Sequence, residues 1–283
     1  MAQAGGREVT IRTLDFGGGK FFKDKSSQME KNPFLGYRSI RVFLREKGLF
    51  KQQLRAILRA SAYGHVKILF PMISSIEEVR QVRELFESTK RELRKEGLPF
   101  DERIPFGIMI EIPSVAIMAH QLVSELDFLS IGTNDPIQYT LAADRDNDMV
   151  NPLYPPFNPA VLKLIRTVVD VAHASGKSVA ICGEMAGDPI YVPLLVGMGF
   201  VDLSMNPVAL LEARKIVRSI LYERWKSVAK TALSISSAEE IHKLVSENMI
   251  CSGLGPQIPQ NFEGTKPINL KDEEVPIITD WGI

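Results

Sequence analysis

The sequence predicts an α/β fold in which parallel strands alternate with helices. Short apolar runs rich in β-branched residues recur along the chain, and amphipathic stretches of helical period lie between them. The chain has 283 residues, of which 45% are hydrophobic, and this is enough to bury one large core or two modest ones. The six strands that we expect cover residues 9–16, 66–71, 106–112, 128–132, 179–183 and 202–205.

The segments between these strands have the pattern of helices. In residues 76–96, for example, Val79, Val82 and Leu85 recur at helical spacing among charged residues, which indicates a solvated face over a buried stripe. A final helix, in the stretch SAEEIHKLVSEN, begins with a Ser-x-x-Glu capping pattern. Residues 144–158 form a long polar loop, and a seventh, short strand is expected within residues 32–38. The other expected helices cover residues 39–46, 50–63, 115–124, 159–175, 189–198 and 208–229.

Composition excludes several classes of protein. Because 34 Lys and Arg residues balance 34 Asp and Glu residues, the charge gives no reason to expect nucleic acid or an anionic membrane as a partner. Two cysteines without repeated Cys/His spacing argue against a disulfide scaffold or a structural zinc site. No apolar run approaches the roughly 18 residues that span a bilayer, and the first residues do not have the pattern of a signal peptide. We therefore expect a cytoplasmic protein with no membrane insertion.

Polar residues at strand ends favour a barrel over an open, doubly wound sheet, a choice that periodicity alone leaves open. In a parallel (β/α)8 barrel the carboxyl ends of all strands open onto one face, where the active site is assembled. We therefore predict a TIM-type barrel over residues 1–250 and a loose tail over residues 251–283, which is rich in Pro and Gly. The residues concerned are Arg12, Arg38, Glu111, Asn134 with Asp135, and Cys182.

Two carboxylates that follow apolar strands, Glu111 and Asp135, are candidate metal ligands. Mg²⁺ commonly takes one or two protein carboxylates and completes its octahedron with substrate oxygens and water. The alternative is that each acid only caps the helix that follows it, and for Asp135 the two roles are compatible.

Three arginines indicate an anionic substrate. Arg12 lies within the apolar stretch VTIRTLDF, where an unpaired charge would be costly, so it should face a partner or an anionic ligand. Arg38 and Arg145 are expected in loops on the same face. Since arginine binds phosphate and carboxylate in a bidentate way, the cluster indicates a small, multiply charged substrate. The alternative is that Arg12 pairs with Asp15 or Glu111.

Cys182, at the end of a buried strand, is a candidate reactive thiol at the barrel mouth. The alternative is an inert, small hydrophobic residue, and this description suits Cys251. The run FGGGK at residues 16–20 is a weak signal for anion binding, because it matches neither the P-loop nor the dinucleotide-binding spacing. None of the four histidines is assigned to catalysis.

Several stretches together resemble one protein family. They are IRTLDFGGGK, NPFLGYRSIR, QLRAILRAS, ILFPMISSIEEV, IEIPS, DFLSIGTNDPIQYTLAADR, NPLYPPFNPAVL and CGEMAGDP. The sequence resembles the C-terminal phosphoenolpyruvate-binding barrel of enzyme I, the phosphoenolpyruvate–protein phosphotransferase of the bacterial sugar phosphotransferase system. The related dikinases of pyruvate and phosphoenolpyruvate share the GTND and CGE segments but are less similar.

The resemblance implies Mg²⁺-dependent transfer of phosphate from phosphoenolpyruvate to a histidine on a separate domain, which passes it to a phosphocarrier protein. It implies that Glu111 and Asp135 hold the metal and that Cys182 protonates the enolate as pyruvate leaves. It also implies a homodimer. In the substrate site, Arg12 and Arg145 would hold the phosphoryl group with Asn134 and Asp135, and Arg38 would meet the carboxylate.

The sequence also departs from the family pattern. Gly19 replaces the usual aspartate, Pro136 replaces the usual leucine, and neither the first barrel strand nor the segment with the phosphorylated histidine is recognisable. Two readings therefore stand beside the enzyme component: a catalytically impaired fragment that binds phosphoenolpyruvate or dimerises, and a dikinase-like fragment.

Overall fold

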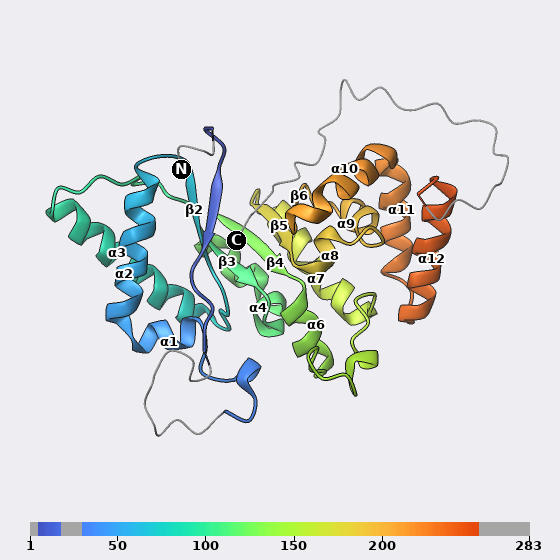
Figure 1. Cartoon of the computed structure of the whole chain (residues 1–283), viewed down its shortest axis with the longest axis horizontal. Coiled ribbons are helices and arrows are strands. Elements are labelled where there is room, and N and C mark those ends of the chain that lie inside the picture. The colour runs from blue at the N-terminus through green and yellow to red at the C-terminus, as the bar shows by residue number, and fades with distance from the viewer. Residues whose placement is uncertain (1–4, 18–29, 255–283) are drawn as a thin grey trace. The chain divides into compact units, whose positions relative to one another are not determined.

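Strands and helices alternate along the chain, as the sequence predicts (Figure 1). The computed structural model describes residues 5–17 and 30–254. The six expected strands are confirmed, although the first ends four residues earlier than predicted. They are β1 (Val9–Arg12), β2 (Val66–Phe70), β3 (Phe106–Ile110), β4 (Phe128–Gly132), β5 (Ser178–Cys182) and β6 (Asp202–Ser204).

Helices follow the strands, and short 3₁₀ turns cover Pro33–Leu35, Val123–Glu125, Asn151–Leu153 and Pro207–Ala209. The helices are α1 (Ile40–Arg45), α2 (Lys47–Ser61), α3 (Ile76–Lys95), α4 (Pro113–Ile117), α5 (Ala119–Leu122), α6 (Asn134–Leu141), α7 (Pro159–Ala174), α8 (Glu184–Gly187), α9 (Val192–Gly197), α10 (Leu210–Ser219), α11 (Tyr222–Ala232) and α12 (Ala238–Cys251). No helix in the described part of the chain is both long and apolar enough to cross a membrane.

Strand order supports the barrel class over the doubly wound one. The sheet runs β1-β2-β3-β4-β5-β6, and the pairs β1–β2, β2–β3 and β5–β6 are parallel. A doubly wound sheet reverses its strand order part-way, whereas successive βα units of a barrel keep chain order. The six strands of the described residues are fewer than the eight of a closed barrel, so the barrel is incomplete.

The seventh strand predicted within residues 32–38 is wrong. Residues Pro33–Leu35 form a 3₁₀ turn, and Arg38 makes one isolated antiparallel bridge with Gly17. Pro33 has no N–H group to contribute to a sheet, and the carboxylate of Glu30 accepts the N–H of Tyr37 at 2.8 Å. These contacts favour a turn over an extended strand.

Two helices predicted as continuous are divided. The expected helix over residues 208–229 breaks at Ile220 and Leu221, which are both extended, into α10 and α11. The expected helix over residues 115–124 divides into α4 and α5. Conversely, α6 and α8 were not predicted. The capping of α12 is confirmed, since the hydroxyl of Ser237 accepts the N–H of Glu240.

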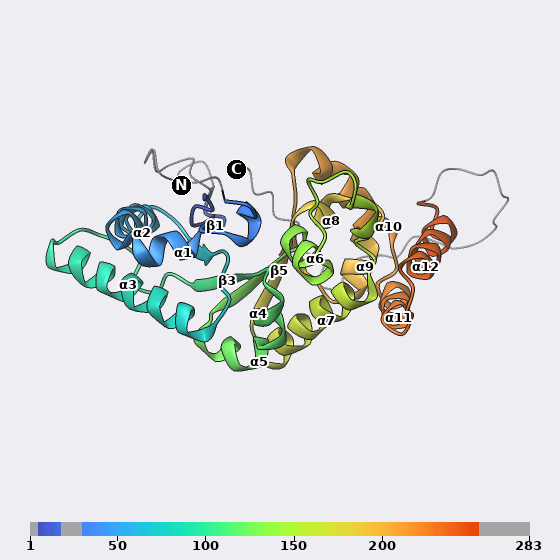
Figure 2. The ribbon, with the colours of Figure 1, turned by 90° about the horizontal axis from the view of Figure 1, so that it is seen from below.

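The chain divides into two compact units, Met1–Ser130 and Ile131–Ile283. The division into a barrel over residues 1–250 and a tail over residues 251–283 stays a prediction, and from residue 255 on the tail lies outside the described residues. In unit 1, α2 and α3 lie side by side (Figure 2) and are joined by ion pairs of Lys51 with Glu92 and of Arg55 with Glu96. A series of aromatic ring contacts links the two helices to β2 and β3. It runs from Phe50 of α2 through Phe70 and then Phe86 of α3 to Phe106.

The core of unit 2 includes α9, which is buried at every residue, and α11, whose Trp225 is fully buried. Gly197 allows the two helices to approach closely: a Cβ atom at this position would overlap the backbone carbonyl of Trp225. The glycine is therefore a packing requirement.

We predict that Gly197→Ala lowers the stability of unit 2 by about 1–3 kcal/mol, the usual cost of forcing extra volume into a packed core. Thermal unfolding followed by circular dichroism measures the change. Gly48→Ala in α2 is the matched control, because no atom lies within 4 Å of its added Cβ, and it should be neutral or stabilising by about 0.5–1 kcal/mol. Equal effects of the two substitutions would contradict the packing argument.

Candidate functional site

In unit 1, two of the predicted residues lie at strand ends. Arg12 is the last residue of β1 and is exposed. The strand was predicted to continue to residue 16, but β1 ends at Arg12 and the side chain is exposed, so burial does not require a partner for its charge. That Arg12 binds an anionic ligand stays a prediction. Glu111 follows β3 directly and is 4% exposed. Its carboxylate accepts a hydrogen bond from the backbone N–H of Met72, which follows β2.

The backbone is strained around these residues. Met72 has a φ of 59°, and Ser39, which follows Arg38, has a φ of 54°. Non-glycine residues rarely adopt such angles, and the strain, of order 1–3 kcal/mol each, commonly occurs at functional sites. Ser39 is held by an N–H bond to the carbonyl of Phe16 at 2.9 Å.

Arg38 does not follow a strand, contrary to the prediction, and lies just before α1. Its guanidinium binds Asp15 in a bidentate way, with Nε to Oδ1 at 3.1 Å and Nη2 to Oδ2 at 2.6 Å. Both side chains are largely buried. Asp15 therefore pairs with Arg38, and not with Arg12 as the alternative reading had it.

In unit 2, Asn134 and Asp135 open α6, two residues after β4. Asp135 is buried, and its Oδ1 lies 3.1 Å from Nη1 of Arg145. The backbone N–H of Arg145 donates to Oε1 of buried Gln138 at 3.2 Å. The structure thus brings together Asn134, Asp135 and Arg145. Pro136 is compatible with this arrangement, since the first turn of a helix does not need its N–H.

The side chain of Asn134 is held by two neighbours. Its Nδ2 donates to Oε1 of Glu184 at 3.3 Å, and its Oδ1 accepts the hydroxyl of Thr133 at 3.3 Å. Glu184 was not predicted as a site residue. Its position two residues after Cys182, in the CGE segment, is the sequence signal that could have identified it.

Cys182 is the last residue of β5 and is partly exposed. Its carbonyl accepts the N–H of Thr133 at 2.9 Å, so the end of β5 lies beside the start of α6. Gly183 has a φ of 104°, and a Cβ atom there would overlap the hydroxyl of Thr133. Cys251, the other free cysteine, is exposed on α12.

Tyr154 is a further residue that the sequence analysis missed. Its hydroxyl donates to the backbone carbonyl of Asn134 at 2.6 Å. Burial raises the pKa of Tyr154 to about 12; the charge of Arg145 lowers it in part, and the carboxylates of Glu184 and Asp135 raise it. No local pattern marks this tyrosine, which lies 20 residues from its acceptor.

The predicted ligands suit a hard cation. Glu111 and Asp135 are both buried carboxylates; the first accepts the N–H of Met72, and the second lies against the guanidinium of Arg145. Residues 5–17 and 30–254 hold no cluster of three or more His, Cys, Asp or Glu side chains suited to a metal. Mg²⁺ commonly takes one or two protein carboxylates, so each of these acids, taken by itself, is of a type that suits magnesium.

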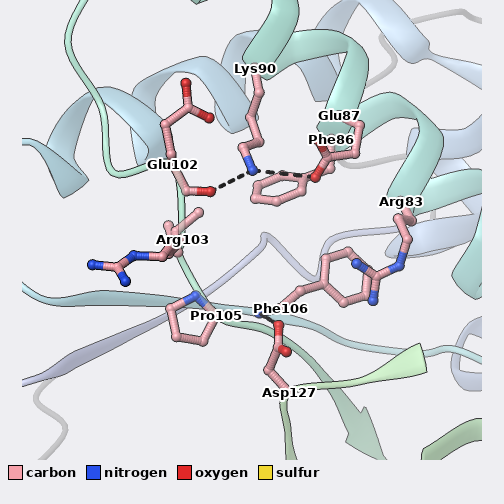
Figure 3. A pocket seen from close by; sticks show the side chains of 10 residues that line it. Arg83, Phe86, Glu87, Lys90, Glu102, Arg103, Pro105, Phe106 and Asp127 are labelled. Atoms are coloured by element: carbon pink, nitrogen blue, oxygen red, sulfur yellow. Dashed lines mark hydrogen bonds and ion pairs between the residues drawn. The ribbon is translucent and has the colours of Figure 1, made fainter. Parts of the chain in front are cut away.

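A hollow of about 380 Å³ lies in unit 1 at the amino-terminal end of β3, whereas Glu111 follows the carboxyl-terminal end of that strand. It is lined by Lys90, Phe106 and Asp127, among others (Figure 3), and Phe106 begins β3, roughly 16 Å along the strand from Glu111. Lys90 binds Glu87 and the carbonyl of Glu102, and Asp127 accepts the N–H of Phe106. These contacts join groups within the wall of the hollow.

The family of this chain is shown by its similarity to known proteins. Residues 1–222 match the family described as PEP-utilising enzyme, PEP-binding domain. The chain belongs to this family. Phosphoenolpyruvate-protein phosphotransferases are its curated relatives, and the resemblance seen in the sequence is confirmed.

Two relatives show the extent of the similarity. The phosphoenolpyruvate-protein phosphotransferase of Geobacillus stearothermophilus is 46% identical over 245 residues, which cover 87% of this chain and 42% of the relative. That of Bacillus subtilis (strain 168) is 46% identical over 242 residues, which cover 86% of this chain and 42% of the relative. The chain therefore spans less than half the length of these relatives.

Among solved structures, a citrate lyase from Burkholderia xenovorans is 18% identical, with a TM-score of 0.47, and the match covers 73% of this chain and 70% of that one. At this level the likeness carries no argument.

We predict that Gly183→Ala destabilises unit 2 by about 1–3 kcal/mol, because the added Cβ meets Thr133 and the backbone angle becomes strained. Thermal unfolding measures the loss. Gly176→Ala is the control: its φ is also positive, at 64°, but no atom lies within 4 Å of its added Cβ. A loss at Gly183 no larger than at Gly176 would contradict the close approach.

Proposed function

We propose that this chain is a component in the Mg²⁺-dependent transfer of a phosphoryl group from phosphoenolpyruvate to a histidine on a separate domain, with release of pyruvate. The observation that carries the proposal is the membership of residues 1–222 in a phosphoenolpyruvate-binding family. The strand-end carboxylates and arginines supply the chemistry that such a ligand requires.

In this mechanism Arg12 and Arg145 bind the phosphoryl oxygens and Asn134 completes the cradle. Phosphoryl transfer depends mainly on positioning and charge neutralisation, which arginines provide. The bond between phosphorus and the enol oxygen breaks as a bond from phosphorus to the histidine nitrogen forms. Arg38 meets the substrate carboxylate and orients the leaving enolate.

Glu111 and Asp135 would hold the magnesium ion. Bound there, the ion would neutralise charge on the phosphoryl and enolate oxygens. The N–H of Met72 and the guanidinium of Arg145 already orient one oxygen of each carboxylate. The two acids belong to unit 1 and unit 2 respectively, and their action on one substrate is part of the proposal.

Cys182 completes the reaction by donating its thiol proton to the methylene carbon of the enolate, which yields pyruvate. A thiol can act as a general acid when it lies within reach of the reacting carbon. Its partial exposure at the end of β5 supports this role.

The partners follow from the same proposal. The relatives are more than twice as long as the matched segment, so their further length leaves room for a histidine domain. We propose that such a domain and a phosphocarrier protein act with this chain in trans, in the service of sugar uptake. We also propose a homodimer in the cytoplasm.

A second candidate is a phosphoenolpyruvate-binding or dimerisation module without turnover. The six strands of the described residues, against eight in a closed barrel, favour this alternative. A dikinase-like fragment is less well supported, because the relatives described above are protein phosphotransferases. Turnover with a supplied histidine domain separates the enzyme from the module.

We predict that phosphoenolpyruvate and Mg²⁺ bind together, because the metal would join the protein carboxylates to substrate oxygens. Calorimetry with Mg²⁺ or with a chelator measures this dependence. Glu111→Gln should abolish most of it, since the amide oxygen still accepts the N–H of Met72 but carries no charge. Equal binding with and without Mg²⁺ in the wild type, or an intact metal dependence in Glu111→Gln, would contradict the assignment.

We predict that Cys182→Ala lowers turnover with a supplied histidine domain by about two to four orders of magnitude, the range for loss of a general acid. The affinity for phosphoenolpyruvate should change little, because a neutral thiol makes no charge-assisted contact with it. Pyruvate release and calorimetry measure the two quantities. Cys251→Ala is the control and should be silent. Normal turnover of Cys182→Ala would remove the catalytic role.

A further inference from the structure

The loop that joins α6 to α7 is fixed at both of its ends. Near its start, Arg145 binds Asp135 through its side chain and Gln138 through its backbone. Near its end, Phe157 is 3% exposed, and its ring centroid lies 4.5 Å from that of Tyr191. The loop therefore has a defined path across the start of α6.

Tyr154 lies in this loop, between the two fixed ends, and its hydroxyl has two partners. It donates to the backbone carbonyl of Asn134 at 2.6 Å, and Arg145 hydrogen-bonds to the same hydroxyl. A phenol has one proton to donate and lone pairs to accept, so it serves both partners at once. The hydroxyl joins the chain at Asn134 to the guanidinium of Arg145.

The environment keeps this hydroxyl protonated. Because burial raises the pKa of Tyr154 to about 12, the group remains a neutral donor throughout the physiological pH range. Three charged groups surround it: Arg145 from the loop, Asp135 from α6 and Glu184 from α8. A phenolate could not donate to the carbonyl of Asn134.

Asn134 and Arg145, the two residues that the Tyr154 hydroxyl joins, would each bind a ligand better if they were held in place beforehand. A long arginine side chain loses much rotamer entropy when it is fixed, and a site gains affinity if that loss occurs before the ligand arrives. Asn134 is the first residue of α6, and the N–H groups in the first turn of a helix have no acceptor within that helix, so fewer backbone hydrogen bonds fix the chain there.

We propose that Tyr154 is a positioning residue that holds Asn134 and Arg145 in the arrangement that binds the phosphoryl group. The inference rests on the proposed function and adds to it a residue that does not itself contact the substrate. Loss of one neutral hydrogen bond corresponds to about a three- to tenfold change in an equilibrium constant.

The test compares Tyr154→Phe with Tyr191→Phe in the full chain. Burial raises the pKa of Tyr191 to about 12 as well, and its ring packs at a tilt against that of Phe157, so the control removes a comparable hydroxyl without touching Asn134. Phosphoenolpyruvate affinity in the presence of Mg²⁺ is measured by calorimetry. Thermal unfolding and hydrogen exchange of the α6 amides are measured in the absence of any ligand.

We expect Tyr154→Phe to weaken phosphoenolpyruvate binding about three- to tenfold and to speed exchange at the start of α6, with little change in the unfolding temperature. Tyr191→Phe should leave both the affinity and the exchange unchanged. Wild-type affinity in Tyr154→Phe would overturn the proposal. So would an affinity loss that accompanies a large fall in unfolding temperature, since that indicates a purely structural role.

The hydrogen-exchange arm separates this inference from the proposed function. If the wild-type chain binds no phosphoenolpyruvate, the proposed function fails, and the positioning of Asn134 is decided by exchange alone. Faster exchange at the start of α6 in Tyr154→Phe, and not in Tyr191→Phe, then supports the positioning role. Equal exchange in both variants refutes it.

Discussion

Burial of the parallel strands is the constraint on which the placement of several candidate functional groups depends. β3 is buried at all five of its positions, and β4 likewise. A charged side chain within such a strand would lose its hydration without gaining a partner. Neither of these strands holds a charged residue, and polar groups follow where they end. Glu111 stands one residue beyond β3, Asn134 two residues beyond β4, and Cys182 at the last position of β5.

The buried acids at these positions are stabilised before any ligand arrives. Glu111 accepts a backbone N–H from the strained residue Met72, and Asp135 faces the guanidinium of Arg145. Such fixed donors compensate part of the cost of burying a carboxylate, and they orient its oxygens. The same contacts that make these acids tolerable in the folded chain thus hold in place the oxygens that the proposed magnesium ion would use.

Local patterns predicted the strands well, because each strand is a short run of consecutive, mainly apolar residues. They failed where the structure is set by contacts distant in the sequence. Nothing local marks the break at Ile220, and the adjoining helix α11 is fixed by its packing against Gly197 of α9.

The candidate site likewise contains residues that local sequence patterns reveal and residues that only distant contacts reveal. Strand-end acids and Cys182 stand out in the sequence, whereas Tyr154 gains its significance only because the loop brings it to Asn134. Arg38 was expected at the end of a strand, and its pairing with Asp15, 23 residues away in the sequence, has no local signal.

The bidentate pair of Arg38 and Asp15 has a consequence for selectivity. Asp15 occupies the edge formed by Nε and Nη2, which is one of the edges through which a guanidinium binds a carboxylate. A second carboxylate that used this edge would have to displace Asp15, and its net gain would be the small difference between two ion pairs. A ligand with a single negative group would gain little from such an exchange. A ligand anchored at the same time by a second anionic group would compete at a much higher effective concentration. If Arg38 meets the substrate carboxylate, as proposed, the internal salt bridge would favour dianions over simple monocarboxylates at this edge.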